Sequence, residues 1–287
     1  MNHCFPYSLP EAPSALPPKY RSPLRPKRAG GVRGNAAREI AGVARLAVAS
    51  LIPLLALLWA PANVKAVTFP EQAERLQLIY AFLLDFRPGQ APLRPGRNEL
   101  EIGLDLTAVP DIDNRIGAKA EPVEPPAVIP RPRLRYLSSG GLMAGATYVP
   151  GLEFSGYQAD LAGGEVGFRF SLGGTLWGVR AFALSGTIKG AITSSVVDDE
   201  FQVNLTGADL LLGGEFGAWL PYLGGGGGNA ETTLSVNSDG VVLKTAGDYA
   251  YLLAGVTLAL DGFRITIEQS RSEDFLDHAT LGISVVF

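Results

Sequence analysis

The last nine residues of the chain, 279–287, read ATLGISVVF. Every second side chain in this stretch is apolar, ending with an aromatic residue, Phe287. Successive side chains of a β-strand point to opposite faces, so the apolar residues share one face and the small or polar residues share the other. The chain is therefore predicted to end in an amphipathic strand. Its apolar face consists of Leu281, Ile283, Val285 and Phe287.

The same alternation recurs upstream of this strand and indicates an all-β fold. A soluble β-sandwich would also alternate, so the pattern alone does not place the sheet in a membrane. Ten strands are favoured. Merging 152–172 into one strand and omitting 98–107 would leave eight. The ten predicted strands are 98–107, 132–148, 152–161, 164–172, 175–190, 201–218, 221–236, 241–260, 263–271 and 276–287.

Three glycine-containing dipeptides are predicted to be two-residue hairpin turns: Gly163-Gly164, Gly173-Gly174 and Asp261-Gly262. Such turns need positive φ at their central residues, which these residue pairs supply. Each turn would pair apolar residues with apolar residues across the hairpin, for example Phe170 with Trp177. The glycine run 224–228 falls inside a predicted strand and indicates a bend or room for bulky neighbours.

The first 66 residues differ in composition from the rest. Residues 1–66 hold nine Lys/Arg and two Asp/Glu, whereas the remainder holds 15 basic and 26 acidic residues. A chain this acidic is not expected to bind nucleic acid, which rewards clustered cations. The only cysteine, Cys4, lies in the basic segment, so no disulfide or cysteine-based metal site is expected in the remainder.

Residues 43–66 read VARLAVASLIPLLALLWAPANVKA. Their apolar run, 46–59, is shorter than the ~20 residues of a membrane-spanning helix. It follows basic residues and ends in Val64-Lys65-Ala66, the pattern of a secretory signal peptide cleaved after Ala66. Residues 1–32 then represent an overextended start. A retained membrane anchor is the alternative.

Residues 67–97 are predicted to contain a short periplasmic amphipathic helix and a Pro-rich linker. Apolar residues recur at helical spacing from Phe69 to Leu83, and Pro88-Gly89 ends the pattern. Such a helix could plug the lumen of a barrel or pack on its rim, and the rim is the favoured position.

Together with the signal peptide and the alternating strands, 279–287 resembles the closing strand of bacterial outer-membrane β-barrel proteins. In that class the terminal aromatic residue and the alternate apolar positions direct assembly. The resemblance implies a transmembrane antiparallel up-and-down β-barrel over 98–287, located in the bacterial outer membrane. Its implied partners are outer-membrane lipid and the barrel-assembly machinery, and a monomer is expected. The C-terminus would face the periplasm, where Trp177, Trp219, Tyr222, Phe263 and Phe287 would form an aromatic girdle.

Charged residues gather on the predicted inward face of this barrel. Buried charges must be paired or solvated, so they are expected to form an ion network that fills the lumen. A polar pore lining is the alternative. The predicted network consists of Glu165, Arg169, Arg180, Asp209, Glu215, Arg264 and Glu268.

The sequence predicts no catalytic residue, no metal site and no cofactor. His278, the only histidine outside the export segment, falls near the external end of the last strand and is expected to be a surface residue. A structural or surface-interaction role is the favoured function. The alternative is a channel for small solutes or hydrophobic molecules, with a small solute or an external ligand as partner. An outer-membrane hydrolase is a third, distant class.

Overall fold

The computed structural model describes residues 69–110, 127–193, 196–272 and 277–287. All of them lie in the structural unit Pro61–Phe287. The predicted export segment and its cleavage site lie outside the described residues.

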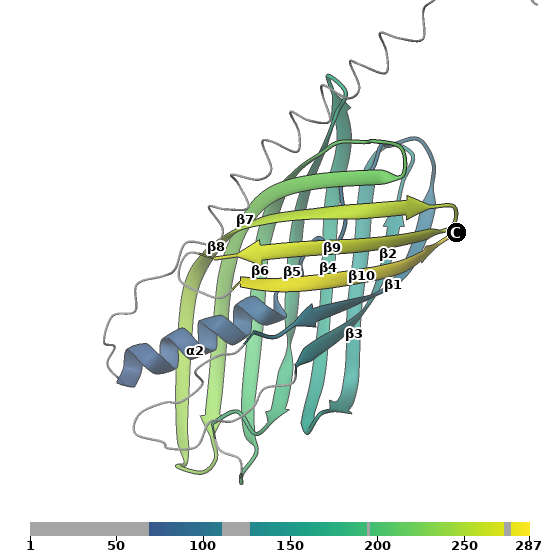
Figure 1. Ribbon diagram of the computed structural model, residues 1–287. Helices are drawn as coiled ribbons and strands as arrows, with labels where there is room; N and C mark the ends of the chain where they lie inside the picture. Colours follow the sequence, from purple (N-terminus) through teal and green to yellow (C-terminus); the bar gives the residue numbers. More distant parts are fainter. Residues whose placement is uncertain (1–68, 111–126, 194–195, 273–276) are drawn as a thin grey trace, which may run out of the picture. The chain divides into compact units, whose positions relative to one another are not determined.

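The ten strands form a closed barrel in which each strand pairs antiparallel with the next and β10 pairs with β1 (Figure 1). The predicted fold class and the favoured strand number are confirmed. The strands are β1 (Glu99–Ala108), β2 (Val128–Leu137), β3 (Leu142–Phe154), β4 (Tyr157–Leu172), β5 (Thr175–Gly190), β6 (Asp199–Gly213), β7 (Trp219–Val236), β8 (Val241–Leu260), β9 (Phe263–Arg271) and β10 (Asp277–Val286).

Large apolar side chains cover the outside of the barrel, and charged side chains face its interior. Ile102, Val166 and Ile267 point outward and are more than half exposed. A soluble barrel would bury such residues, whereas a membrane-spanning barrel presents them to lipid. The apolar residues of the last strand also point outward, and their role in assembly stays a prediction. They are Leu281, Ile283, Val285 and Phe287.

Two of the three predicted hairpins are confirmed. Gly173 and Gly174 have φ of 59° and 85°, and Asp261-Gly262 joins β8 to β9. Phe170 pairs with Trp177 as predicted. Their rings lie nearly parallel on the outer face, 6.2 Å apart at an angle of 7°.

The turn predicted at Gly163-Gly164 is wrong, because both glycines lie inside β4. At Gly163 a Cβ would come within 3.0 Å of the Ala183 carbonyl oxygen and of Thr147 Cγ2, so this glycine permits close packing rather than a turn. The hairpin turn lies instead at Ser155-Gly156, where φ is 51° and 79°. The predicted strand 132–148 is likewise two strands, β2 and β3, and the two errors cancel in the strand count.

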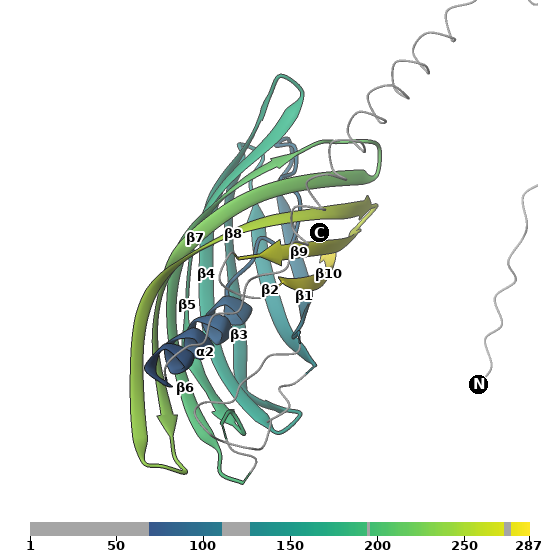
Figure 2. The same ribbon diagram turned by 60° about the vertical axis from the view of Figure 1, so that its left-hand side comes forward.

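The only helix in the described part of the chain is α2 (Phe69–Leu84). It lies inside the barrel, so the expected position on the rim is wrong. It packs against β7 and β8 (Figures 1 and 2). Gln77 hydrogen-bonds to Thr245 and Thr232, which places the helix in the half of the barrel away from Phe287. This helix is shorter than a membrane-spanning helix requires.

After α2 the chain runs through the lumen in an extended form. We call residues 85–93 the plug segment, because Asp85, Phe86 and Arg87 are at most 2% exposed. The chain leaves the lumen at the end that holds Phe287, where β1 begins and the Leu100 amide donates to the Phe287 carbonyl at 3.1 Å. The N-terminal part of this unit therefore fills the barrel that the strands enclose.

The glycine run 224–228 lies in the middle of β7 and makes room for bulk inside the lumen. A Cβ at Gly226 would collide with Asp209 and the Tyr251 hydroxyl, and one at Gly228 with the Tyr249 hydroxyl. Both tyrosine rings pack edge-on against Phe82 of α2. The glycines thus allow the tyrosines to reach the helix.

We predict that Gly226→Val lowers the free energy of unfolding by about 1–3 kcal/mol, the usual cost of overpacking a filled interior. The matched control is Gly164→Val, at a position where a Cβ meets only a carbonyl oxygen at 3.6 Å. The control is expected to change stability by less than about 0.5 kcal/mol. Guanidinium unfolding of the protein refolded into phosphatidylcholine vesicles, followed by tryptophan fluorescence, measures both. Equal shifts for the two variants would contradict the packing described.

Candidate functional site

Four charged side chains from β2, β4, β5 and β6 meet at the centre of the lumen. We call Arg135, Glu165, Arg180 and Asp209 the central ion cluster. Arg135 Nε lies 2.9 Å from one Glu165 oxygen, and Arg180 Nη1 lies 2.8 Å from the other. Arg180 Nε also donates to Asp209 at 2.6 Å. All four side chains are at most 2% exposed, so their charges are compensated by one another rather than by water.

A second group of charges lies nearer the C-terminal end of the barrel. Arg264 of β9 bridges two carboxylates of β1, at 2.6 Å from Glu99 and 3.2 Å from Glu101. Ser284 donates to Glu101 at 2.6 Å. These contacts cross the seam where the last strands meet the first and tie the barrel closed from within.

The structure buries six of the seven predicted network residues and brings three of them, Glu165, Arg180 and Asp209, together in the central ion cluster. Of the others, Arg169 donates to the Ser138 carbonyl and Glu268 accepts from the Tyr222 hydroxyl at 2.7 Å. Arg264 belongs to the second group.

Glu215 does not belong to the network. Strand β6 ends at Gly213, so Glu215 lies beyond the barrel wall and pairs at 3.0 Å with Arg94, with both side chains exposed. Tyr222, which was expected in the aromatic girdle, is also misplaced. It is buried in the lumen, whereas Trp219 and Phe287 are exposed as a girdle requires.

Sequence reasoning missed the arginines of β2. Arg131, Arg133 and Arg135 are 2–6% exposed and face the lumen, where Arg133 pairs with Asp105 at 2.7 Å. The three arginines occur at every second position in the stretch PRPRLRY, 130–136, which indicates one face of a strand. The prolines between them obscured it, because proline argues against a strand interior.

These arginines hold the plug segment by its backbone. Arg131 donates to the Asp85 carbonyl at 2.6 Å, and Arg133 donates to the Arg87 and Pro88 carbonyls at 2.5 Å each. Arg135 adds a bond of 2.7 Å to the Pro88 carbonyl. Guanidinium groups carry several donors in a fixed geometry and can bridge carboxylates and carbonyls together.

The charges of the plug segment are paired with each other. Asp85 and Arg87 lie 3.2 Å apart, and the Arg87 guanidinium is stacked between the rings of Phe82 and Tyr251, at 4.1 and 3.7 Å from their centroids. Among the described residues, the plug segment makes no ion pair with the wall. It is held by hydrogen bonds to carbonyl groups, by aromatic contacts and by the bond from the Ala91 amide to Thr257.

Little free volume remains around the plug segment. Two cavities border it, of about 10 and 20 Å³. Such a volume holds one water molecule at most. The described residues of the central ion cluster and the plug segment therefore fill this layer tightly.

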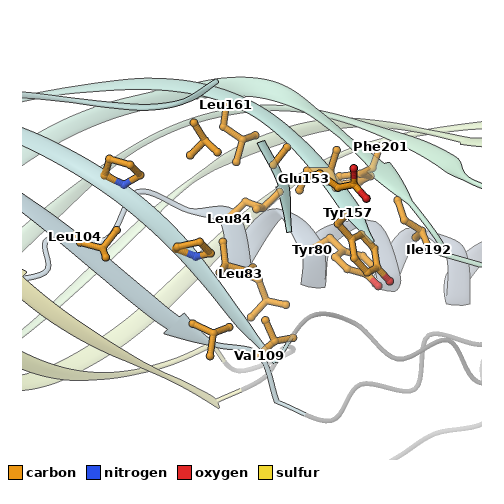
Figure 3. A pocket seen from close by; sticks show the side chains of 17 residues that line it. Tyr80, Leu83, Leu84, Leu104, Val109, Glu153, Tyr157, Leu161, Ile192 and Phe201 are labelled. Carbon is orange, nitrogen blue, oxygen red and sulfur yellow. The ribbon is translucent and has the colours of Figure 1, made fainter. Parts of the chain in front are cut away.

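A larger cavity of about 330 Å³ lies between α2 and the strand ends away from Phe287. Leu83 and Leu84 of α2 lie between Leu104 of β1 and Tyr157 of β4 (Figure 3). The lining includes inward-facing, buried side chains such as Leu161 as well as outward-facing, exposed ones such as Leu104. The cavity therefore borders both faces of the wall.

The opening lies where β2 and β3 separate. These strands pair only from Leu137↔Met143 to Arg133↔Thr147, so residues 128–132 of β2 have no partner in β3. Pro130 and Pro132 still align with β1. A proline nitrogen has no hydrogen to donate, so both prolines must turn their nitrogens toward β3 and leave that edge without two donors. The sequence thus builds a gap into the wall, and Pro130 and Pro132 line it.

His278 differs from its expected position. Its ring faces inward, is 3% exposed, and packs edge-on against Phe82 at 4.9 Å. Neither ring nitrogen has a hydrogen-bond partner among the described residues. A catalytic role would require access and a carboxylate partner, which the described surroundings do not provide. The described ranges also contain no cluster of three His, Cys, Asp or Glu side chains fit to bind a metal ion.

No protein-family model matches the chain, and no curated protein sequence matches it. Among solved structures, it is similar to Ail, the attachment invasion locus protein of Yersinia pestis, at 14% identity, covering 67% of this chain and 99% of that chain with a TM-score of 0.32. It is also similar to the Pseudomonas putida toluene transporter TodX, at 12% identity, covering 79% and 77% with a TM-score of 0.29. A mutant Rh. blastica porin shares 11% identity over 66% of this chain and 99% of that chain, with a TM-score of 0.21. At these values the likenesses carry no argument about function.

We predict that Arg180→Met lowers the free energy of unfolding by about 3–5 kcal/mol, because it leaves two buried carboxylates short of a cation. Arg94→Met, which breaks the exposed pair with Glu215, is the matched control and is expected to cost at most about 1 kcal/mol. Guanidinium unfolding in vesicles measures both variants. If the two variants lost a similar free energy of unfolding, burial of the central ion cluster would not be the reason for its contribution to stability.

We also predict that deleting residues 69–93 opens the lumen to ions. In a planar bilayer the deletion variant should give steady single-channel conductance, while the full chain should give none, because the plug segment fills the charged layer. Heat-modifiable mobility on a gel verifies that both barrels are folded. Equal conductance of the two proteins would show that the plug segment does not close the barrel.

Proposed function

We propose that this protein is a bacterial outer-membrane barrel that takes up small apolar molecules and passes them through its side wall. The observation that supports this proposal is the apolar cavity of about 330 Å³ at the separation of β2 and β3. Small-molecule sites have volumes of ~300–1,000 Å³ and mostly apolar linings. The alternative function of the sequence analysis, hydrophobic-molecule transport, thus gains a specific structural basis.

The membrane location is supported by the outer face of the barrel. Its exposed apolar side chains need lipid around them, because a water-exposed apolar surface of this extent is costly. The outward-facing C-terminal strand and the predicted signal peptide support the outer membrane in particular, with the C-terminal end in the periplasm. In this orientation α2 and the apolar cavity lie in the external half of the barrel.

Passage through the side wall suits an apolar molecule better than passage along the lumen. The axial path crosses the central ion cluster and the backbone of the plug segment, which offer an apolar molecule no favourable contacts. The gap beside Pro130 and Pro132 connects the cavity to the level of the surrounding lipid, and its lining is apolar. A molecule entering the cavity from outside can therefore reach the lipid without crossing the central ion cluster.

A surface-interaction role, the function that the sequence analysis favours, stays a prediction. The segments 111–126 and 273–276, which follow β1 and β9 in the sequence, lie outside the described residues. The enzymatic class is not supported by the surroundings of His278.

We predict that Ala159→Phe weakens binding of a neutral apolar ligand, because the new ring occupies part of the cavity that Ala159 lines. The probe is 1-N-phenylnaphthylamine, titrated by fluorescence against the full chain in phosphatidylcholine nanodiscs, with empty nanodiscs subtracted. The apparent Kd should rise at least about tenfold, as expected when a buried apolar contact is lost. The matched control is Val166→Phe, on the same strand but facing outward, which should bind like the unaltered protein.

Passage is tested by the rate at which the same probe enters Gram-negative cells that produce each protein. The unaltered protein and Val166→Phe should accelerate entry, and Ala159→Phe should not. If the protein bound the probe saturably but did not accelerate its entry, the proposed passage would be wrong and only the proposed binding would stand. Absence of saturable binding to the unaltered protein would overturn it.

A further inference from the structure

The geometry points to a cationic amphiphile as the ligand of the apolar cavity: a molecule with one apolar chain and one protonated amine, rather than a fatty acid. This inference rests on the proposed function and names the class of molecule that the cavity selects. It depends on the distribution of charge along the cavity lining.

Among the residues that the structure describes, the lining of the cavity contains one charged residue. Of the 17 described lining residues, 16 are aliphatic, aromatic or proline, and the remaining one is Glu153. No described lysine or arginine lines the cavity. A carboxylate-bearing ligand would therefore place an uncompensated negative charge in apolar surroundings and beside a second carboxylate, which is unfavourable on both counts.

Glu153 is located where a headgroup would be. It lies at the end of the cavity shared by Tyr157 and Ile192, away from Leu104 (Figure 3). It is exposed, so an ion bound to it keeps part of its hydration. An amphiphile can thus place its head at Glu153 and extend its chain past Leu84 toward Leu104.

The Glu153 carboxylate is not neutralised by the protein. It forms no ion pair with any other described residue, in contrast to the carboxylates of the central ion cluster, which contact arginines at 2.6–2.9 Å. A solvated carboxylate at the edge of an apolar cavity is complementary to an ammonium group, which brings a charge and three donors. The Glu153 carboxylate is therefore available to a ligand.

The surface beside the cavity entrance carries negative charge, as Glu153 does. Glu153 also borders a polar basin of about 370 Å³ that is lined by Asp198, Asp199 and Glu200. Lys189, the single cation of that lining, lies 3.4 Å from Glu200. The resulting negative potential raises the local concentration of cations and repels anions before they reach the cavity.

The test compares three ligands with equal chains and different heads: decylamine, decanol and decanoate. Each displaces 1-N-phenylnaphthylamine from the full chain in phosphatidylcholine nanodiscs at neutral pH, with empty nanodiscs subtracted. Decylamine should bind about fivefold more tightly than decanol, the effect of one exposed ion pair, and decanoate more weakly than both. In Glu153→Gln the amine and the alcohol should bind alike. The control Glu200→Gln, which alters the basin but not the cavity lining, should keep most of the amine preference.

The outcomes separate this inference from the function on which it rests. If all three compounds displace the probe but decanoate binds as tightly as decylamine, the charge selection is wrong and the apolar site stands. An amine preference that survives in Glu153→Gln overturns the assignment of Glu153 as the headgroup site. If none of the compounds displaces the probe, and Ala159→Phe behaves like the unaltered protein, the proposed function itself fails.

Discussion

The need to neutralise arginine inside a closed barrel determines most of this structure. Arg135 and Arg180 meet Glu165 in the lumen, where water cannot compensate them. A guanidinium group has five N–H donors, and one carboxylate does not use them all. On β2 some of the remaining donors bind the carbonyl groups of the plug segment. The pairing that stabilises the wall therefore also fixes the chain that fills it.

Strand β2 has two roles because its sequence alternates two residue types. Its inward residues include the arginines that hold the plug segment, and the neighbouring Pro130 and Pro132 prevent pairing with β3. The same few residues thus close the barrel along its axis and open it at its side. Because α2 borders the resulting cavity and continues directly into the plug segment, an occupant of the cavity contacts the element that closes the lumen.

The sequence predicted the wall well and the interior less well. Alternation and the Gly173-Gly174 turn depend on neighbouring residues, so the pairing of Phe170 with Trp177 could be derived. Gly163-Gly164 has the same local chemistry as a turn, and only contacts with β3 and β5 show that it lies within a strand. Glu215 was assigned inward by continuing an alternation past the end of β6. The burial of His278 against Phe82 and the apolar cavity depend on how the N-terminal segment enters the barrel, which no local pattern records.

The pairing of Asp85 with Arg87 has an electrical consequence. Residues 85–93 contain one acidic and one basic side chain, which neutralise each other. If this segment slides along the barrel axis with the pair intact, no net charge crosses the membrane. The work that a transmembrane potential does is proportional to the charge moved, ~2.3 kcal/mol per elementary charge per 100 mV. A Donnan potential across the membrane would therefore do no net work on this segment.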